Sequence, residues 1–224
     1  MNLDPELHRS ISESLIDNLV ALHALDIHKT DLVQLGKPEG YVMRQVEGWI
    51  KRYYNSETDK LIQMDETAEW LKRNQPPTQS ATFLHNDYKH DNVVLDTTNL
   101  SKILAVLDWE MSTVGDPLMD LGATLAYWAE AGDDEAMKQF NLTWLPGNLN
   151  RQEVIERYAL KSGRNVSNIP FYYVFGLYKN AVIAQQIYAR WKQGLTKDPR
   201  FGQLLLVIKS LSVRTVKSIE KGMI

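Results

Sequence analysis

The sequence predicts an α+β fold that is mostly helical, with a small β-hairpin insertion near its middle. Three observations lead to this prediction. Apolar residues recur at helical spacing over residues 1–80, short β-branched runs separated by turn residues follow over 81–110, and helical spacing returns over 111–224. Because no repeat or low-complexity linker divides the chain, we expect one compact unit over residues 1–224.

The first helix is predicted to begin after Asp4 and to run to about Leu25. Asp4 is a favourable N-cap, Pro5 suits the first helical position, and Glu6 lies near the positive end of the helix dipole. The apolar residues that recur along this segment at helical spacing are Ile11, Leu15, Leu19 and Leu22.

Two further helices are predicted before the middle of the chain. The apolar residues on one face of the first are Val42, Val46, Trp49, Ile50 and Tyr53. Those of the second are Leu61, Met64, Ala68 and Leu71, and this helix stops before Pro76. Each apolar stripe is most simply a face that packs on the core.

The central insertion is predicted to contain strands at Leu84, at residues 93–95 and at residues 102–109. After Asp116 and Pro117 the pattern returns to helices, which we expect at about residues 118–130, 150–162, 170–192 and 200–220. The dense polar chemistry of the chain lies in the insertion.

Composition excludes several classes of function. A formal net charge of −3 gives no basic footprint, so we expect no nucleic-acid partner. The absence of cysteine excludes disulfides, thiolate catalysis and cysteine-ligated zinc, and it fits the cytoplasm, where we expect the protein. The most apolar long segment, residues 171–191, contains Lys179 and Arg190, so we expect a buried helix there and no membrane partner.

Residues 83–96 concentrate polar chemistry between two apolar flanks and read FLHNDYKHDNVVLD. Phosphoryl transfer of the kinase type needs a carboxylate to accept the proton of the attacking hydroxyl and an amide oxygen to hold Mg²⁺. Asp87 and Asn92, five residues apart on one loop, match both needs, as in the H-R-D-x4-N pattern. Lys89 lies where many protein kinases have a lysine that neutralises the transferred phosphate.

A second carboxylate suits the same chemistry. Asp108 follows the apolar run ILAVL and stands sixteen residues after Asn92, in the place of the aspartate in D-F-G. Carboxylate oxygens of this kind suit Mg²⁺, which binds through few protein ligands together with phosphate. For Glu110, an assisting contact to the ion through water and a solvated surface position are both consistent with the sequence.

Three segments carry a resemblance to a known family, and they read GYVMRQVEGWIKRY, LHNDYKHDNVVLD and AVLDWEMSTVGDPLMDLG. Together they resemble the aminoglycoside phosphotransferase and choline kinase-like family, in the branch related to kinase-like domains fused to acyl-CoA dehydrogenases. The resemblance runs from about residue 10 to residue 224. It implies a protein-kinase-like C-terminal lobe that phosphorylates a hydroxyl group of a small molecule, using ATP as co-substrate and Mg²⁺ as cofactor.

The resemblance also implies roles for individual residues. Asp87 would be the catalytic base, assisted by Lys89, and Asn92 and Asp108 would be the Mg²⁺ ligands. Lys89 and Asp108 would also contact the nucleotide phosphates. The residues expected to support the loop are His85, Asp116 and Asp120. Antibiotic kinases usually read Gly-Asp-Leu-His where this chain has residues 86–89, which argues against an aminoglycoside acceptor; the branch implies a hydroxyacyl-CoA or a related hydroxy acid derivative.

The N-terminal lobe of such kinases is not recognisable in the sequence. No G-x-G-x-x-G or G-x4-G-K motif occurs, and the glycines before the loop, Gly36, Gly40 and Gly48, do not cluster. We therefore expect an incomplete kinase with little activity alone, whose N-terminal lobe is lost, truncated or supplied elsewhere. Loss of the lobe would expose apolar surface near residues 10–25 and favour self-association.

Several alternatives remain open at this level. The groove could serve a non-catalytic module that binds a ligand or partner, and Lys89 could form a structural ion pair. We interpret the histidines His8, His23 and His28 as ordinary helix residues. The acidic residues that could attract a cationic substrate, but more simply form a solvated face, are Glu57, Asp59, Asp65, Glu66 and Glu69. The aromatic residues that could line an acyl pocket, but more simply belong to the core, are Trp128, Trp144, Tyr172 and Tyr173.

Overall fold

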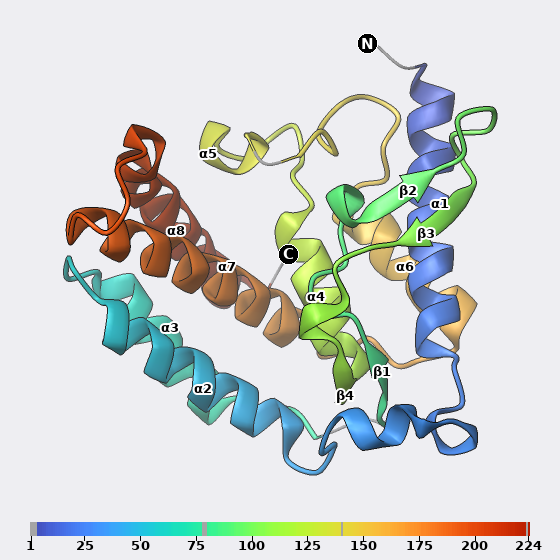
Figure 1. Cartoon of the computed structure of the whole chain (residues 1–224), viewed down its shortest axis with the longest axis horizontal. Helices are drawn as coiled ribbons and strands as arrows, with labels where there is room; N and C mark the ends of the chain where they lie inside the picture. The colour runs from blue at the N-terminus through green and yellow to red at the C-terminus, as the bar shows by residue number, and fades with distance from the viewer. Residues whose placement is uncertain (1–3, 78–79, 140, 223) are drawn as a thin grey trace.

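The computed structural model describes residues 4–77, 80–139, 141–222 and 224, and it has the predicted mostly helical α+β architecture (Figure 1). The α-helices are α1 Pro5–His23, α2 Tyr41–Ser56, α3 Ile62–Arg73, α4 Pro117–Tyr127, α5 Glu135–Lys138, α6 Arg151–Ser162, α7 Ile169–Lys192 and α8 Leu204–Lys221. The strands are β1 Thr82–Leu84, β2 Val93–Leu95, β3 Ile103–Val106 and β4 Thr113–Gly115. All the predicted helices are present.

The first helix begins as its sequence predicts. The Oδ1 oxygen of Asp4 accepts a hydrogen bond from the amide of Glu6 at 2.9 Å, and Pro5 opens α1. The helix ends at His23, two residues earlier than expected. The predicted last helix is in two parts, a 3₁₀ turn at Pro199–Gln203 followed by α8, and Asp198 caps the turn.

Helix α7 runs through the centre of the molecule and packs against α4 on one side and α8 on the other (Figure 1). Two glycines let α4 and α7 approach closely. A Cβ atom at Gly122 would lie 2.3 Å from the carbonyl oxygen of Tyr172, and one at Gly176 would lie 2.4 Å from the carbonyl oxygen of Gly122. The backbones of α4 and α7 are therefore in contact at these two glycines.

Gly122→Ala is expected to lower the free energy of unfolding by about 1–3 kcal/mol, because the new methyl group meets rigid backbone and outweighs the gain in helix propensity. Urea denaturation followed by circular dichroism measures this change. Gly132→Ala is the control, since nothing lies within 4 Å of a Cβ atom at that position. Equal unfolding midpoints for the two variants would contradict the close helix contact.

The insertion contains two antiparallel strand pairs. Strands β2 and β3 form the predicted hairpin, with Val93 opposite Val106. Strands β1 and β4 pair through Thr82 and Gly115, and this second pair was not predicted. Three residues directly before a helix cap are too few to show an alternating pattern, so the sequence alone does not indicate β4.

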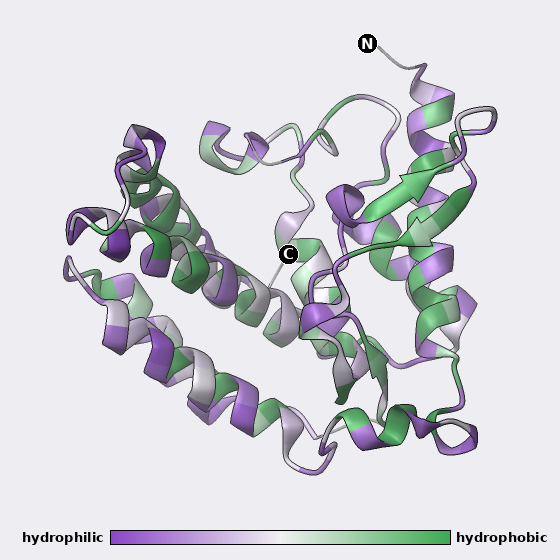
Figure 2. Cartoon of the chain, in the orientation of Figure 1, coloured by the Kyte–Doolittle hydropathy of each residue, from purple (hydrophilic) through white to green (hydrophobic). Residues whose placement is uncertain are grey.

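Exposed apolar surface is limited near residues 10–25, where Leu25 is 46% exposed. In α1, Leu15 and Leu19 are fully buried against the core. The strands β2 and β3 are hydrophobic along most of their length (Figure 2), and in this region Leu104 is 55% exposed and Leu107 is 47% exposed. Other exposed apolar residues are spread over the chain, and Leu160 at 82% and Leu195 at 72% are the most exposed of those described.

Residues 171–191, for which the sequence predicted a buried helix and not a membrane span, lie in α7, and most of this helix is buried. Among the described residues, no helix combines the length and apolar character that crossing a bilayer requires.

Candidate active site

Residues 85–92 form a loop that joins β1 to β2. The side chain of Asp120 in α4 holds this loop through hydrogen bonds. The Oδ2 oxygen of Asp120 accepts from the amide of His85 at 2.7 Å, and its Oδ1 oxygen accepts from the amide of Asn86 at 2.9 Å. Asp116 caps α4 by accepting from the amide of Leu118 at 2.9 Å, which fixes the start of this helix. Both aspartates are completely buried beneath the loop.

A buried chain of hydrogen bonds continues behind Asp120. His23 Nε2 lies 3.2 Å from Asp120 Oδ2, and His23 Nδ1 lies 2.8 Å from the hydroxyl of Tyr158. Burial acts to raise the pKa of Asp120, but the hydrogen bond and charge of His23 and the amide of His85 hold that pKa below its ordinary value. The interpretation of His23 as an ordinary helix residue is therefore wrong, since it supports the loop across the fold.

His85 connects the loop to the segment that carries Asp108. Its Nε2 atom donates to the carbonyl of Leu107 at 2.8 Å, and its Nδ1 atom accepts from the amide of Asp87 at 3.2 Å. The amide of Leu107 in turn donates to the carbonyl of Asn92 at 2.8 Å. Asp108, the next residue along the chain, is thereby brought beside the loop.

The side chains of Asp87, Lys89 and Asn92 meet at the surface of the loop. Asp87 Oδ2 accepts from Lys89 Nζ at 2.7 Å and from Asn92 Nδ2 at 3.0 Å. Asn92 Nδ2 also donates to the carbonyl of Asp87 at 2.8 Å, so the Oδ1 oxygen of Asn92 is the atom left to bind a cation. The loop therefore offers the carboxylate of Asp87 and the amide oxygen of Asn92, and the ammonium group of Lys89 is paired with that carboxylate.

The oxygen ligands of this site fit Mg²⁺ only in combination with other ligands. In the described ranges no group of three or more His, Cys, Asp or Glu side chains could hold a metal ion. Asp108 is exposed and Asn92 is largely buried, so an ion here would bind one carboxylate, one amide oxygen, water and phosphate. Mg²⁺ favours that kind of coordination.

Backbone strain is concentrated at the same site. Asn86 has φ 66° and Asp108 has φ 64°, and within the part of the chain that the structure describes they are the non-glycine residues with positive φ. The side chain of Asn86 is held at both ends, since its Nδ2 donates to the carbonyl of Met111 at 2.9 Å and its Oδ1 accepts from the hydroxyl of Tyr41 at 3.0 Å. These contacts hold the backbone directly before Asp87, the candidate base.

Two residues at the site were not identified from the sequence. Lys179 of α7 is buried and donates to the carbonyl of Asn86, and burial lowers the pKa of its ammonium group. Tyr127 of α4 lies beside Asp87, and burial followed by the negative charge of Asp87 raises the pKa of its phenol. No local motif marks either residue, because each reaches the loop from another part of the chain.

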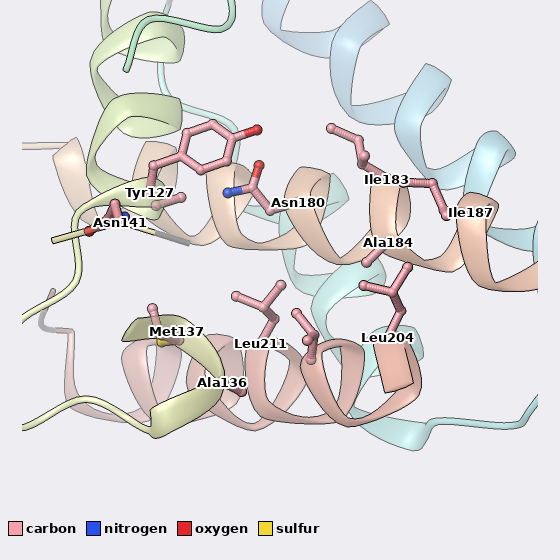
Figure 3. Close-up of a pocket in the computed structure, with 12 residues that line it drawn as sticks. Tyr127, Ala136, Met137, Asn141, Asn180, Ile183, Ala184, Ile187, Leu204 and Leu211 are labelled. Atoms are coloured by element: carbon pink, nitrogen blue, oxygen red, sulfur yellow. The ribbon is translucent and has the colours of Figure 1, made fainter. Parts of the chain in front are cut away.

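Tyr127 also borders an apolar cavity of about 190 Å³ between α4, α7 and α8. Tyr127 and Asn180 lie at one end of the cavity, and Leu204 and Leu211 of α8 face α7 across it (Figure 3). Lys89 Nζ lies 4.7 Å from the centre of the Tyr127 ring. One tyrosine thus separates the candidate catalytic groups from an apolar space.

The acidic residues before the loop form a solvated face. Asp59 pairs with Lys192 at 3.0 Å, and Asp65 pairs with Lys60 at 2.7 Å, both near the surface. The aromatic residues that belong to the core are Trp128, Tyr172 and Tyr173, and none of the three lines the apolar cavity. The core interpretation is confirmed for these three residues, whereas Trp144 is only partly buried and its ring centre lies 5.7 Å from Lys138 Nζ.

Comparisons with known proteins support the chemistry read from the site. The family model described as "Phosphotransferase enzyme family" matches residues 1–155. The chain is 34% identical over 196 residues to "Acyl-CoA dehydrogenase family member 11" of Rattus norvegicus, covering 86% of this chain and 25% of that protein. It is 32% identical over 192 residues to "Acyl-CoA dehydrogenase family member 10" of Mus musculus, covering 84% and 18%. The chain thus spans a quarter or less of these two relatives.

Solved structures share the fold. A Ralstonia eutropha protein assigned to the aminoglycoside phosphotransferases superposes with a TM-score of 0.82 at 26% identity, covering 96% of this chain and 68% of that one. Choline kinase from Cryptosporidium parvum superposes with a TM-score of 0.65 at 12% identity, covering 96% and 66%. The second likeness concerns the fold alone.

Proposed function

Because this chain belongs to the phosphotransferase enzyme family, we propose that it is the C-terminal lobe of a small-molecule kinase that transfers the γ-phosphate of ATP to a hydroxyl group. One observation carries the proposal. Asn92 donates to Asp87, and the backbone of Asn92 bonds to Leu107 directly before Asp108, which brings the candidate base and the two candidate metal ligands close together. We propose that residues 1–224 form this lobe as one unit.

In the proposed reaction, Asp87 accepts the proton of the acceptor hydroxyl as the oxygen bonds to the γ-phosphorus. The bond from that phosphorus to the bridging oxygen of ADP breaks, and ADP leaves. When bound, Mg²⁺ would neutralise charge on the phosphates, held by Asn92 Oδ1 and by Asp108. Lys89 would exchange its ion pair with Asp87 for a contact to the transferred phosphate. His85, Asp116 and Asp120 would keep the loop in place.

We propose a hydroxyacyl-CoA or a related hydroxy acid derivative as the acceptor. Two observations support this class. Curated relatives are named as acyl-CoA dehydrogenase family members, and the apolar cavity has room for part of an aliphatic chain on the far side of Tyr127 from Asp87. A chain bound there would have to pass Tyr127 for its hydroxyl group to reach Asp87.

We expect weak phosphoryl transfer by residues 1–224 alone. The sequence has no glycine-rich loop to hold the α- and β-phosphates. Contacts through Mg²⁺ and the phosphates would then supply most of the affinity for nucleotide.

Calorimetric titration with Mg·ATP tests the proposal, with Asp108→Asn as the main variant. Asparagine tolerates the positive φ of Asp108, so the variant removes charge without adding strain. We expect the parent chain to bind Mg·ATP and the variant to bind at least about tenfold more weakly, because the carboxylate is the charged ligand of the ion.

Glu39→Gln is the control for loss of one negative charge at an exposed position. It should bind Mg·ATP as the parent chain does. Equal affinity in the parent and Asp108→Asn chains would exclude Asp108 as a ligand. Absence of binding to every chain would favour a non-catalytic module that uses the same groove.

A further inference from the structure

A second cavity, of about 200 Å³, lies beside the loop and shares no lining residue with the apolar cavity, and we call it the basic pocket. Its walls come from α2, Asn86 of the loop, residues 111–113, α4 and α7. The residues used below are Tyr41, Trp49, Arg52, Asn86 and Lys179, all of which line it. Asn86 directly precedes Asp87, so the basic pocket adjoins the candidate base.

Two cations line the basic pocket and neither has a carboxylate partner in the described parts of the chain. Lys179 is 3% exposed, and its ammonium group donates to the carbonyl of Asn86. The guanidinium of Arg52 lies 4.7 Å from the centre of the Trp49 ring. No aspartate or glutamate is among the residues that line the basic pocket. A buried ammonium group without a counter-ion is costly, so the basic pocket favours an anion.

The nearest carboxylates are already engaged. Asp87 and Asp120 are the acidic groups that act on Lys179, while Lys89 and Arg52 are the neighbouring cations. Asp87 accepts from Lys89 and Asn92, and Asp120 accepts from two loop amides and from His23. No carboxylate is therefore available to pair with Lys179 alone, and its side chain lines the basic pocket.

The basic pocket also disfavours a cationic acceptor. Aromatic side chains bind quaternary ammonium groups through the ring face. Here Arg52 occupies the Trp49 ring at 4.7 Å, and Lys179 Nζ lies 5.6 Å from the same ring. A second cation would meet two like charges at this ring.

We propose that the basic pocket binds an anionic group of the acceptor, a carboxylate or a phosphate, through Arg52 and Lys179. This inference rests on the proposed function, since it assigns the acceptor of the same site. The guanidinium and ammonium groups would donate charge-assisted hydrogen bonds to the anion.

The positions of the basic pocket and the apolar cavity also constrain which carbon of the acceptor carries the hydroxyl group. Lys179 and Asn180 are neighbours on α7, yet Lys179 lines the basic pocket and Asn180 lines the apolar cavity. Asp87 lines neither cavity but is near both, since its charge acts on Lys179 of the basic pocket and on Tyr127 of the apolar cavity. The acceptor that fits carries its hydroxyl between an anionic end and an apolar tail.

Four small hydroxyl compounds of matched size test the charge preference: glycerol, glycerate, glycerol 3-phosphate and choline. Binding is measured by saturation-transfer NMR on the full chain, without nucleotide or Mg²⁺. We expect at least one of the two anions to bind about tenfold more tightly than glycerol, and choline to bind no better than glycerol. The stronger of glycerate and glycerol 3-phosphate distinguishes a carboxylate from a phosphate.

Arg52→Gln and Lys179→Met are expected to bring the anion affinity down to that of glycerol. Lys51→Gln is the matched control, because it removes the same charge from the adjacent exposed residue of α2, outside the basic pocket. Since Arg52 is exposed, its variant is expected to fold even if Lys179→Met does not.

Three results would overturn the inference: choline or glycerol binding as tightly as the anions, no binding of either anion, or equal loss of anion affinity in Arg52→Gln and Lys51→Gln. Because the assay contains no nucleotide, it is independent of the Mg·ATP titration. Anion binding without Mg·ATP binding would overturn the kinase proposal alone, and the reverse result would overturn the acceptor assignment alone.

Discussion

Asp87→Asn is expected to slow phosphoryl transfer by about 10²–10⁴-fold, the range lost when a general base is removed. Asparagine keeps the size of the side chain and one oxygen that can accept from Lys89 or Asn92, so the loop should keep its shape. The rate is measured with the protein in excess over radiolabelled ATP, which detects the weak turnover expected of residues 1–224. Hydroxy acids serve as acceptors in this assay.

Asp91→Asn is the matched control for Asp87→Asn. It changes the charge by the same amount on the same loop, and Asp91 is exposed. Mg·ATP affinity should stay within about threefold of the parent in both variants, since a base acts in the transition state more than in nucleotide binding. Equal transfer rates in Asp87→Asn and the parent chain would exclude Asp87 as the base.

Asp120→Asn is expected to lower the free energy of unfolding by about 3–5 kcal/mol, which is typical for breaking a buried charged network. The carboxylate accepts from two loop amides and from His23, and an asparagine would turn an NH₂ group toward one of these donors. Urea denaturation measures the loss. Glu66→Gln, at an exposed position of α3, should unfold as the parent does.

The same substitution should change how stability depends on acid. Hydrogen bonding to His23 and the loop amides lowers the pKa of folded Asp120 below its ordinary 3.8, so its stabilisation is complete above that value. The stabilisation is lost as the pH falls through the lowered folded-state pKa. Asp120→Asn should therefore flatten the fall in stability below about pH 4. A parent and variant that lose stability in parallel there would contradict the ionised state of Asp120.

The elements of the fold that were predicted correctly are those marked by a local sequence signal, such as a helix cap or an apolar stripe. Asp4 caps α1, and the apolar stripe from Val42 to Tyr53 is the buried face of α2. The missed elements are short: α5 covers only Glu135–Lys138, and β4 covers Thr113–Gly115. Neither spans a full period of its pattern, so tertiary pairing decides their structure.

The candidate site likewise contains residues that a local motif predicts and residues that it does not. Asp87 and Asn92 are close in sequence, and one loop motif was sufficient to predict that they meet. His23, Tyr127 and Lys179 reach the loop from three different helices, so their part in the site depends on tertiary packing. The roles assigned to all these residues stay predictions until the substitutions are made.

The supports of the loop also set an order of events during synthesis. His85 is made 35 residues before Asp120, Asn86 is made 93 residues before Lys179, and Tyr158 follows His23 by 135 residues. A ribosome makes the chain from its N-terminal end, so the loop emerges while its supports are still missing. The full set of supports is therefore complete only after α7 has docked, because Lys179 is the last of these residues that contact the loop to be made.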